Sequence, residues 1–184
     1  TVESALLGIK HPEKPPPPEK TVYFDMTDYC RDTVCHYCKV VGKGVKLKDA
    51  TTPFPPAGVL KDEDDEEKGE LQEHASSVLM KGLWLCRLGR PDAQKAIQHM
   101  ATRVQKWSRN DDKRLFRAMC YLWSSRDFRL KGTIKDRPED LYLLLYVDAD
   151  LCGDFDTTTS TSGVFLVLAG PRGTFFPLAW LAKN

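Results

Sequence analysis

The feature that most constrains the fold is a change of hydrophobic period near residue 128. After it come three runs of apolar, β-favouring residues, at 141–147, 163–169 and 174–181. Gly170-Pro-Arg-Gly173, between the last two runs, has the composition of a tight hairpin turn. Pro177 predicts an edge position or a bulge in the third run. The sequence therefore predicts an α+β fold, with helices first and an antiparallel sheet at the end.

The chain before residue 128 contains four segments with apolar residues at helical spacing. Thr27 is the expected N-cap of the first helix, which runs to about Val41. The second helix covers about 71–88, and the third begins at Pro91, because proline suits the first turn of a helix. Asn110 or Asp111 is expected to cap the fourth. We expect these helices to bury their apolar faces against one another.

The remaining segments are predicted to be linkers and loops. Residues 11–20 are rich in proline and can neither propagate a helix nor pair as a central strand, whereas residues 21–24 resemble a strand. Residues 42–70 are expected to form a loop that ends in an acidic tract. Their composition predicts that residues 1–20 and 55–73 are not ordered.

Bulk composition excludes two classes of protein. No apolar run reaches the roughly 18 residues that span a bilayer, so no membrane partner is expected. The N-terminus has no basic region followed by a long apolar core, as a signal peptide would. We therefore expect an intracellular location, in cytoplasm or nucleus, with the six cysteines as free thiols. Both ends look cut, and the chain is interpreted as an excerpt of a longer reading frame.

A net charge of +1 conceals a division between two segments. Residues 62–67 are all acidic, whereas residues 81–117 carry ten basic and three acidic side chains. One interpretation is a solvated helical surface; the other is a surface that meets a phosphate backbone. In the second case, the expected nucleic-acid contacts are Arg87, Arg90, Lys113, Arg114 and Arg117.

A cluster of cysteine and histidine first suggests a zinc site. Cys30, Cys35, His36 and Cys38 follow a Cys-x4-Cys-His-x-Cys order, which matches no common zinc-finger spacing. Cys30 and Cys38 lie on the apolar stripe of the first helix, whereas Cys35 and His36 point elsewhere. Ligands on opposite sides of one helix cannot converge on a tetrahedral ion, so core and surface cysteines are the better interpretation.

The stretch Tyr146-Val-Asp-Ala-Asp150 allows two enzymatic interpretations. A polymerase palm signature needs two adjacent aspartates, but Ala149 separates Asp148 from Asp150, so the two alternate across a strand. The other interpretation is the first strand of a nuclease sheet, where one aspartate helps to hold Mg²⁺. Two-metal phosphodiester hydrolysis requires several carboxylates that converge on the ions. Asp148 is the candidate for the first of them, and the alternative is an acidic residue that merely ends a strand.

The residues around Asp148 resemble the start of the ribonuclease H domain in copia-type retrotransposon polyproteins. In that family, an Asp-Ala-Asp-Trp-Ala-Gly-Asp segment precedes a Ser-Thr-Ser-Gly strand and then a Ser-Trp strand that ends in lysines. The matching segments here are Asp148-Ala-Asp-Leu-Cys-Gly-Asp154, Asp156-Thr-Thr-Thr-Ser-Thr-Ser-Gly-Val-Phe-Leu-Val-Leu168, and Pro177-Leu-Ala-Trp180 with Lys183. Upstream, Gly89-Arg-Pro-Asp92 is similar to the family's helix junction, and the likeness spans about residues 21–184.

This resemblance implies a fold and a division of the chain. The fold would be a helical thumb- and connection-like segment followed by the first three antiparallel strands of a truncated ribonuclease H-like sheet. The implied parts are a proline-rich linker at 1–20, a thumb-like helix and loop at 21–60, an acidic loop at 61–70, a helical connection at 71–131 and the partial nuclease domain at 132–184.

The function implied is that of the parent polyprotein, an RNA-directed DNA polymerase and ribonuclease H. This chain would grip an RNA–DNA hybrid and interact with the rest of the polyprotein. Mg²⁺ belongs to the complete enzyme; here Asp148 is an incomplete Mg²⁺ site, so we expect no tight metal binding and little or no activity of the chain alone.

Departures from the family support an alternative. Leu151 and Cys152 replace the usual Trp-Ala, and Trp123-Ser-Ser125 stands where Lys-Gly-Thr is typical. The alternative is a degenerate or repurposed binding or scaffold protein without enzymatic activity, descended from such an element.

Overall fold

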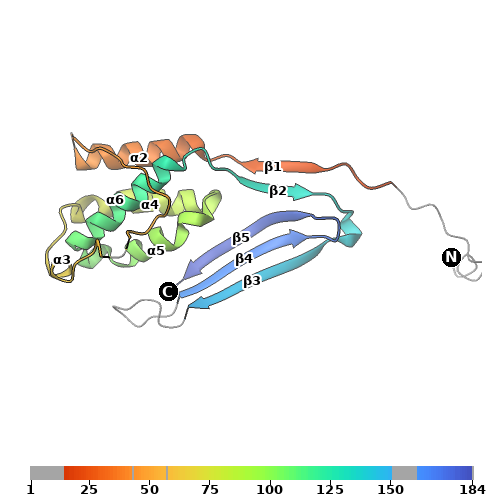
Figure 1. Cartoon of the computed structure of the whole chain (residues 1–184). Coiled ribbons are helices and arrows are strands. Elements are labelled where there is room, and N and C mark those ends of the chain that lie inside the picture. Colours follow the sequence, from red (N-terminus) through yellow and green to blue (C-terminus); the bar gives the residue numbers. More distant parts are fainter. Residues whose placement is uncertain (1–14, 43, 57, 151–160, 184) are drawn as a thin grey trace, which may run out of the picture.

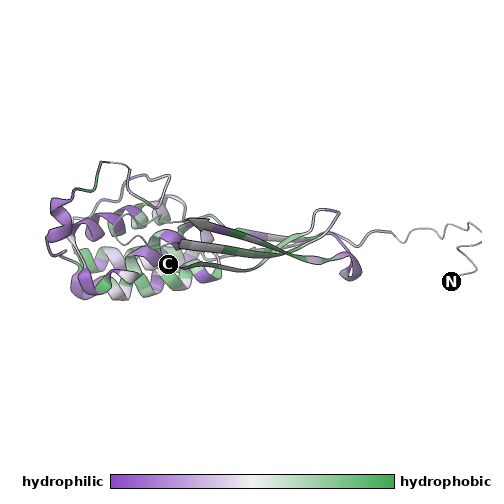
Figure 2. Cartoon of the chain, turned by 90° about the horizontal axis from the view of Figure 1, so that it is seen from below, coloured by the Kyte–Doolittle hydropathy of each residue, from purple (hydrophilic) through white to green (hydrophobic). Residues whose placement is uncertain are grey.

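The computed structural model describes residues 15–42, 44–56, 58–150 and 161–183. The protein has a mixed α+β architecture, in which a group of packed helices lies beside an antiparallel sheet of five strands (Figure 1). The sheet extends away from the helices as one layer (Figures 1 and 2). None of the helices in the described part of the chain is both long and apolar enough to cross a membrane.

The helices follow the periodicity of the sequence closely. The α-helices are α2 (Thr27–Val41), α3 (Glu63–Glu66), α4 (Gln72–Leu88), α5 (Gln94–Thr102) and α6 (Arg109–Ser124). Among the described residues, the short 3-10 helices η1 (Pro91–Ala93) and η2 (Val104–Lys106) lie between α-helices, and η3 (Pro138–Asp140) lies between two strands of the sheet. The predicted ends of α2 and α4 and the start at Pro91 are confirmed, because apolar spacing and proline placement are local signals.

Two of the expected helix caps are wrong. Thr27 is the first helical residue of α2 rather than its cap, and its N–H donates to Asp25 Oδ1 over 3.0 Å. Helix α6 is capped by Ser108, not by Asn110 or Asp111. Ser108 Oγ accepts from the N–H of Asp111, whose carboxylate accepts from the N–H of Ser108, so the two residues form a capping box.

The expected loop at residues 42–70 contains a helical turn. Helix α3 lies within the acidic tract, and Asp64 on it is buried. Residues 58–73 are described throughout, and α4 already begins at Gln72, so the prediction that this region is not ordered is wrong there. Composition misleads here because the acidic side chains find cationic partners on α6.

The sheet has the strand order β1-β2-β5-β4-β3, and all its neighbours are antiparallel. Its strands are β1 (Lys20–Phe24), β2 (Leu130–Ile134), β3 (Tyr142–Asp150), β4 (Thr161–Ala169) and β5 (Phe175–Lys183). The three predicted C-terminal strands form the meander β3-β4-β5. The pairing of the strand-like segment 21–24 with β2, and of β2 with β5, was not predicted.

The turn and the bulge in this meander agree with the sequence. Gly173, in the β4–β5 turn, has φ of 91°, a conformation that glycine adopts without strain. Pro177 lies at a register shift opposite Val167, where the ladder does not need its missing N–H. Since β5 lies between β2 and β4, the bulge explains how a central strand accommodates this proline.

The hydrophobic core lies within the helices. It is built mainly from α2, α4, α5 and α6, with Trp107 closing one end. The sheet is covered much less: on β3, which is an outer strand, Leu143 and Val147 are each 64% exposed. The helices and the sheet meet where α5 packs against β5, and there Trp180 Nε1 donates to the carbonyl oxygen of Cys86 over 2.8 Å.

We expect Trp180→Phe to lower the free energy of unfolding by roughly 1–2 kcal/mol, because it removes this hydrogen bond and part of the indole packing. Urea unfolding followed by circular dichroism measures the change. Tyr142→Phe is the control, since it removes a hydroxyl from a half-exposed ring on β3 and should change stability by less than about 0.5 kcal/mol. Equal stability of Trp180→Phe and wild type would contradict this anchoring role.

Candidate nucleic-acid interface

Asp148 lies at the rim of a hollow between the sheet and the start of α5. It is exposed on β3 and pairs with Gly163 of β4. The hollow has a volume of about 440 Å³ and is bordered by η1, α5, β3, β4 and β5. The C-terminal ends of β3 and β5 both point toward the helices (Figure 1), so the connectivity of the meander brings Asp148 to this position.

A row of aromatic side chains forms one side of this hollow. Tyr146, Phe165 and Trp180 are register partners on neighbouring strands and therefore share a face of the sheet. The rings of Phe165 and Trp180 are stacked, with centroids 6.1 Å apart. Asp148 follows Tyr146 on the same face, and Lys95 of α5 borders the hollow from the helical side. The hollow thus combines flat apolar surfaces with one negative and one positive side chain.

The residues that line this hollow do not fit a two-metal site. Asp148 is the one carboxylate among its described lining residues. Across the described residues, no group of three or more His, Cys, Asp or Glu side chains could hold a metal ion. The side chain of Asp150 and all of Asp154 lie outside the described residues. Mg²⁺ needs several oxygen ligands in near-octahedral geometry, and the described lining residues supply only the carboxylate of Asp148.

Arg90 cannot contact a phosphate in this structure, and the expectation that it does is wrong. Its side chain is 1% exposed. The guanidinium Nη2 lies 2.7 Å from Asp92 Oδ2, and it also donates to Ser125 Oγ over 2.6 Å. Nη1 donates to the carbonyl oxygen of Ser125 over 3.1 Å. The sequence showed an arginine in a basic segment, but the fold places it at the junction of α4, η1 and α6.

Asp92 is held on its other side by Tyr121, whose hydroxyl donates to Asp92 Oδ2 over 2.6 Å. Burial raises the pKa of Asp92, but hydrogen bonds from Arg90 and Tyr121 outweigh it and leave this pKa below its ordinary value. The ionised form of Asp92 is therefore the one that the folded protein stabilises.

We expect Arg90→Gln to reduce the free energy of unfolding by roughly 2–3 kcal/mol, because it removes the buried guanidinium that bonds Ser125 and pairs with the partly exposed Asp92 carboxylate. Arg87→Gln is the matched control: Arg87 is exposed on the last turn of α4, so its loss should cost less than about 0.5 kcal/mol. Chemical denaturation of both variants measures the difference. If Arg90→Gln were as stable as Arg87→Gln, the structural role of Arg90 would be refuted.

Acid should destabilise the protein through Asp92. Because the folded-state pKa of Asp92 lies below its ordinary value of 3.8, its stabilising contribution is complete above that value and is lost as the pH falls further. We expect the free energy of unfolding to drop more steeply below pH ~4 in wild type than in Asp92→Asn. Urea titrations at a series of pH values measure both slopes, and identical slopes would exclude this source of acid sensitivity.

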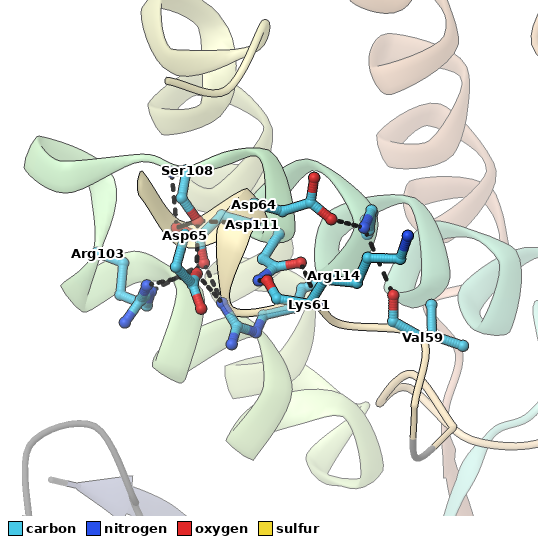
Figure 3. Close-up of polar contacts among 10 residues, drawn as sticks. Val59, Lys61, Asp64, Asp65, Arg103, Ser108, Asp111 and Arg114 are labelled. Carbon is cyan, nitrogen blue, oxygen red and sulfur yellow. Dashed lines mark hydrogen bonds and ion pairs between the residues drawn. The ribbon is translucent and has the colours of Figure 1, made fainter. Parts of the chain in front are cut away.

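The acidic segment, residues 61–70, lies against the N-terminal half of α6 and neutralises it (Figure 3). Lys113 pairs with Asp64, and Arg109 Nη1 lies 2.7 Å from Glu67 Oε2. Asp65 Oδ1 accepts from Ser108 Oγ over 3.0 Å. The hydrogen bond to Lys113 is the main cause that holds the pKa of Asp64 below its ordinary value.

Within α6, Arg114 Nη1 lies 2.8 Å from Asp111 Oδ1, which also contacts Arg103 Nε over 2.9 Å. Asp111 is fully buried and the side chain of Arg114 is only 13% exposed. Lys113 and Arg114 therefore bind internal carboxylates, and the prediction that both present their charges to a phosphate backbone does not fit this arrangement.

The two remaining predicted contacts lie on different elements. Arg87 is exposed on α4. Arg117 Nε donates to the carbonyl oxygen of Thr52 over 2.9 Å. Arg117 lines a hollow between α2, α6 and the residues Pro55, Pro56 and Val59, not the one beside Asp148. The structure thus does not bring the five predicted basic residues together on one surface.

Lys95, which borders the Asp148 hollow, was one basic residue among ten in its segment, and its local sequence carries no signal that distinguishes it.

The cysteines of α2 divide between core and surface as their spacing predicts. Cys30 is buried, Cys38 packs against the core, and Cys35 is exposed. Nε2 of His36 lies 3.1 Å from Ser77 Oγ on α4. The thiols of Cys30, Cys35, Cys38, Cys86 and Cys120 are free, whereas Cys152 lies outside the described residues.

Comparison with known proteins adds no family assignment: no protein-family model, no curated protein and no solved structure matches the chain.

Proposed function

We propose that this chain is part of a copia-type retrotransposon polyprotein and contributes to reverse transcription. The helices would form its thumb- and connection-like segment, and β3, β4 and β5 would be the first three strands of its ribonuclease H-like domain. The order of the motifs in the sequence supports this proposal. The observation that carries it is the position of Asp148, an exposed carboxylate near the end of the first strand of an antiparallel meander.

The nucleic acid would contact the surface around the Asp148 hollow. Lys95 and Arg87 would meet phosphates, which position a duplex without reading its sequence. The apolar rings of Tyr146 and Trp180 would face the sugars and base edges. Arg109, Lys113 and Arg114 of α6 would contribute little, because internal carboxylates already compensate their charges. The substrate class proposed is an RNA–DNA hybrid.

Fluorescence anisotropy with a labelled RNA–DNA hybrid tests this proposal. Affinity should fall steeply between about 50 and 200 mM salt, since each phosphate contact contributes roughly 0.9 to the slope of log K against log salt. The double variant Lys95→Gln/Arg87→Gln should weaken binding several-fold and reduce this slope by about 1.8. Asp148→Asn should tighten binding in the absence of metal, because it removes a negative charge beside the phosphates.

Lys39→Gln, a change at an exposed lysine on α2, is the control and should leave hybrid affinity unchanged. Affinity that is insensitive to salt, or an equal loss in the control and the double variant, would exclude the proposed interface.

The second candidate is a non-enzymatic binding or scaffold protein derived from such an element. The observation in its favour is the internal pairing of Lys113, Arg109 and Arg114, which reduces the positive charge available to nucleic acid. Absence of hybrid binding in the folded wild-type chain would favour this candidate.

A further inference from the structure

A second hollow, separate from the one beside Asp148, lies between α2 and α6 and is closed by Pro55, Pro56, Val59 and Leu71. Its volume is about 540 Å³, which falls within the roughly 300–1,000 Å³ typical of small-molecule sites. Apolar side chains supply most of its wall; among them are Tyr37, Pro56, Val59, Leu71 and Phe116. Such a wall favours an apolar ligand body, because contact removes apolar surface from water.

The charges at the edge of this hollow are not equally compensated. Asp112 accepts from the N–H of Glu70 over 2.7 Å and from Trp107 Nε1 over 2.7 Å. Arg109 is paired with Glu67, and Lys113 with Asp64. These groups therefore already have charged or hydrogen-bonded partners within the protein.

Arg117 is the exception among the cations of this hollow. Nε donates to the carbonyl oxygen of Thr52 over 2.9 Å, and Nη2 donates to Thr52 Oγ1 over 3.1 Å. Both acceptors are neutral, and no carboxylate of the described residues pairs with Arg117. A guanidinium has five N–H donors, so Arg117 can bind an anion while it keeps both bonds to Thr52.

The spacing along α6 separates the two ends of the hollow. Arg109, Lys113 and Arg117 are four residues apart and lie on one side of the helix. At 1.5 Å per residue, Arg117 lies about 12 Å along the axis from Arg109. The hydrogen bond to Glu67 is the main cause that raises the pKa of Arg109. The nearby carboxylate of Glu70 raises it further. The Arg109 end is therefore rich in carboxylates, and the Arg117 end keeps a positive charge beside Phe116.

We propose that this hollow binds a small amphipathic carboxylate, an aromatic or aliphatic acid. Its carboxylate would form a charge-assisted, two-pronged hydrogen bond with Arg117, and its apolar body would lie against Phe116 and Tyr37. One uncompensated cation beside an apolar wall matches one anionic head on an apolar body. A polyanion would instead need several available cations, and Arg109 and Lys113 are already paired.

Isothermal titration calorimetry of the full chain with 2-naphthoate tests this site, with 2-naphthalenemethanol as the uncharged analogue. Wild type should bind naphthoate at least ten-fold more tightly than the alcohol. Arg117→Gln should weaken naphthoate binding at least ten-fold and leave the alcohol unaffected, and Arg117→Lys should retain part of the affinity. Phe116→Leu should weaken both ligands.

Arg31→Gln is the matched control, since it removes an exposed arginine from α2 outside this hollow, and it should bind naphthoate as wild type does. Circular dichroism establishes that each variant is folded. No naphthoate binding by wild type, equal binding of the acid and the alcohol, or unchanged binding by Arg117→Gln would each overturn the proposal.

Discussion

The ion pair between buried Arg90 and the partly exposed Asp92 links three parts of the helical core. It lies at the junction of α4 and η1, and its two members also bond Tyr121 of α6 and Ser125, the residue that follows α6. Arg90 Nη1 further lies 3.7 Å from Cys30 Sγ on α2. Loss of the Arg90 side chain would leave the buried acceptors on Ser125 without their donor, which is costly. The packing of α2 and α6 at this junction therefore depends on both residues being present.

The same kind of pairing determines which charges can reach a ligand. Buried Asp111 binds Arg103 and Arg114, and the acidic segment binds Lys113 and Arg109. The chain has ten basic residues between positions 81 and 117. Few of these side chains therefore reach solvent without an acidic partner from the protein itself. Under the proposed function, the nucleic acid lies beside the Asp148 hollow and not along α6.

Local patterns predicted much of this fold. Apolar spacing located α2 and α4, the runs after residue 128 located β3, β4 and β5, and glycine and proline located the turn and the bulge. What the sequence could not reveal depends on partners far away along the chain. Ser108 caps α6, β1 pairs with β2 across more than 100 residues, and Arg90 is buried where it bonds both Asp92 and Ser125. A basic residue in an amphipathic helix carries no local sign of whether a carboxylate will meet it.

Hydrogen–deuterium exchange of the full chain, with and without a bound RNA–DNA hybrid, tests most directly where the nucleic acid lies. Our account predicts slower exchange on binding at residues 91–95 and 146–148, which border the Asp148 hollow. It predicts no change at residues 109–117, whose cations are paired with the acidic segment or line the second hollow. Protection confined to residues 109–117, with none beside Asp148, would contradict it.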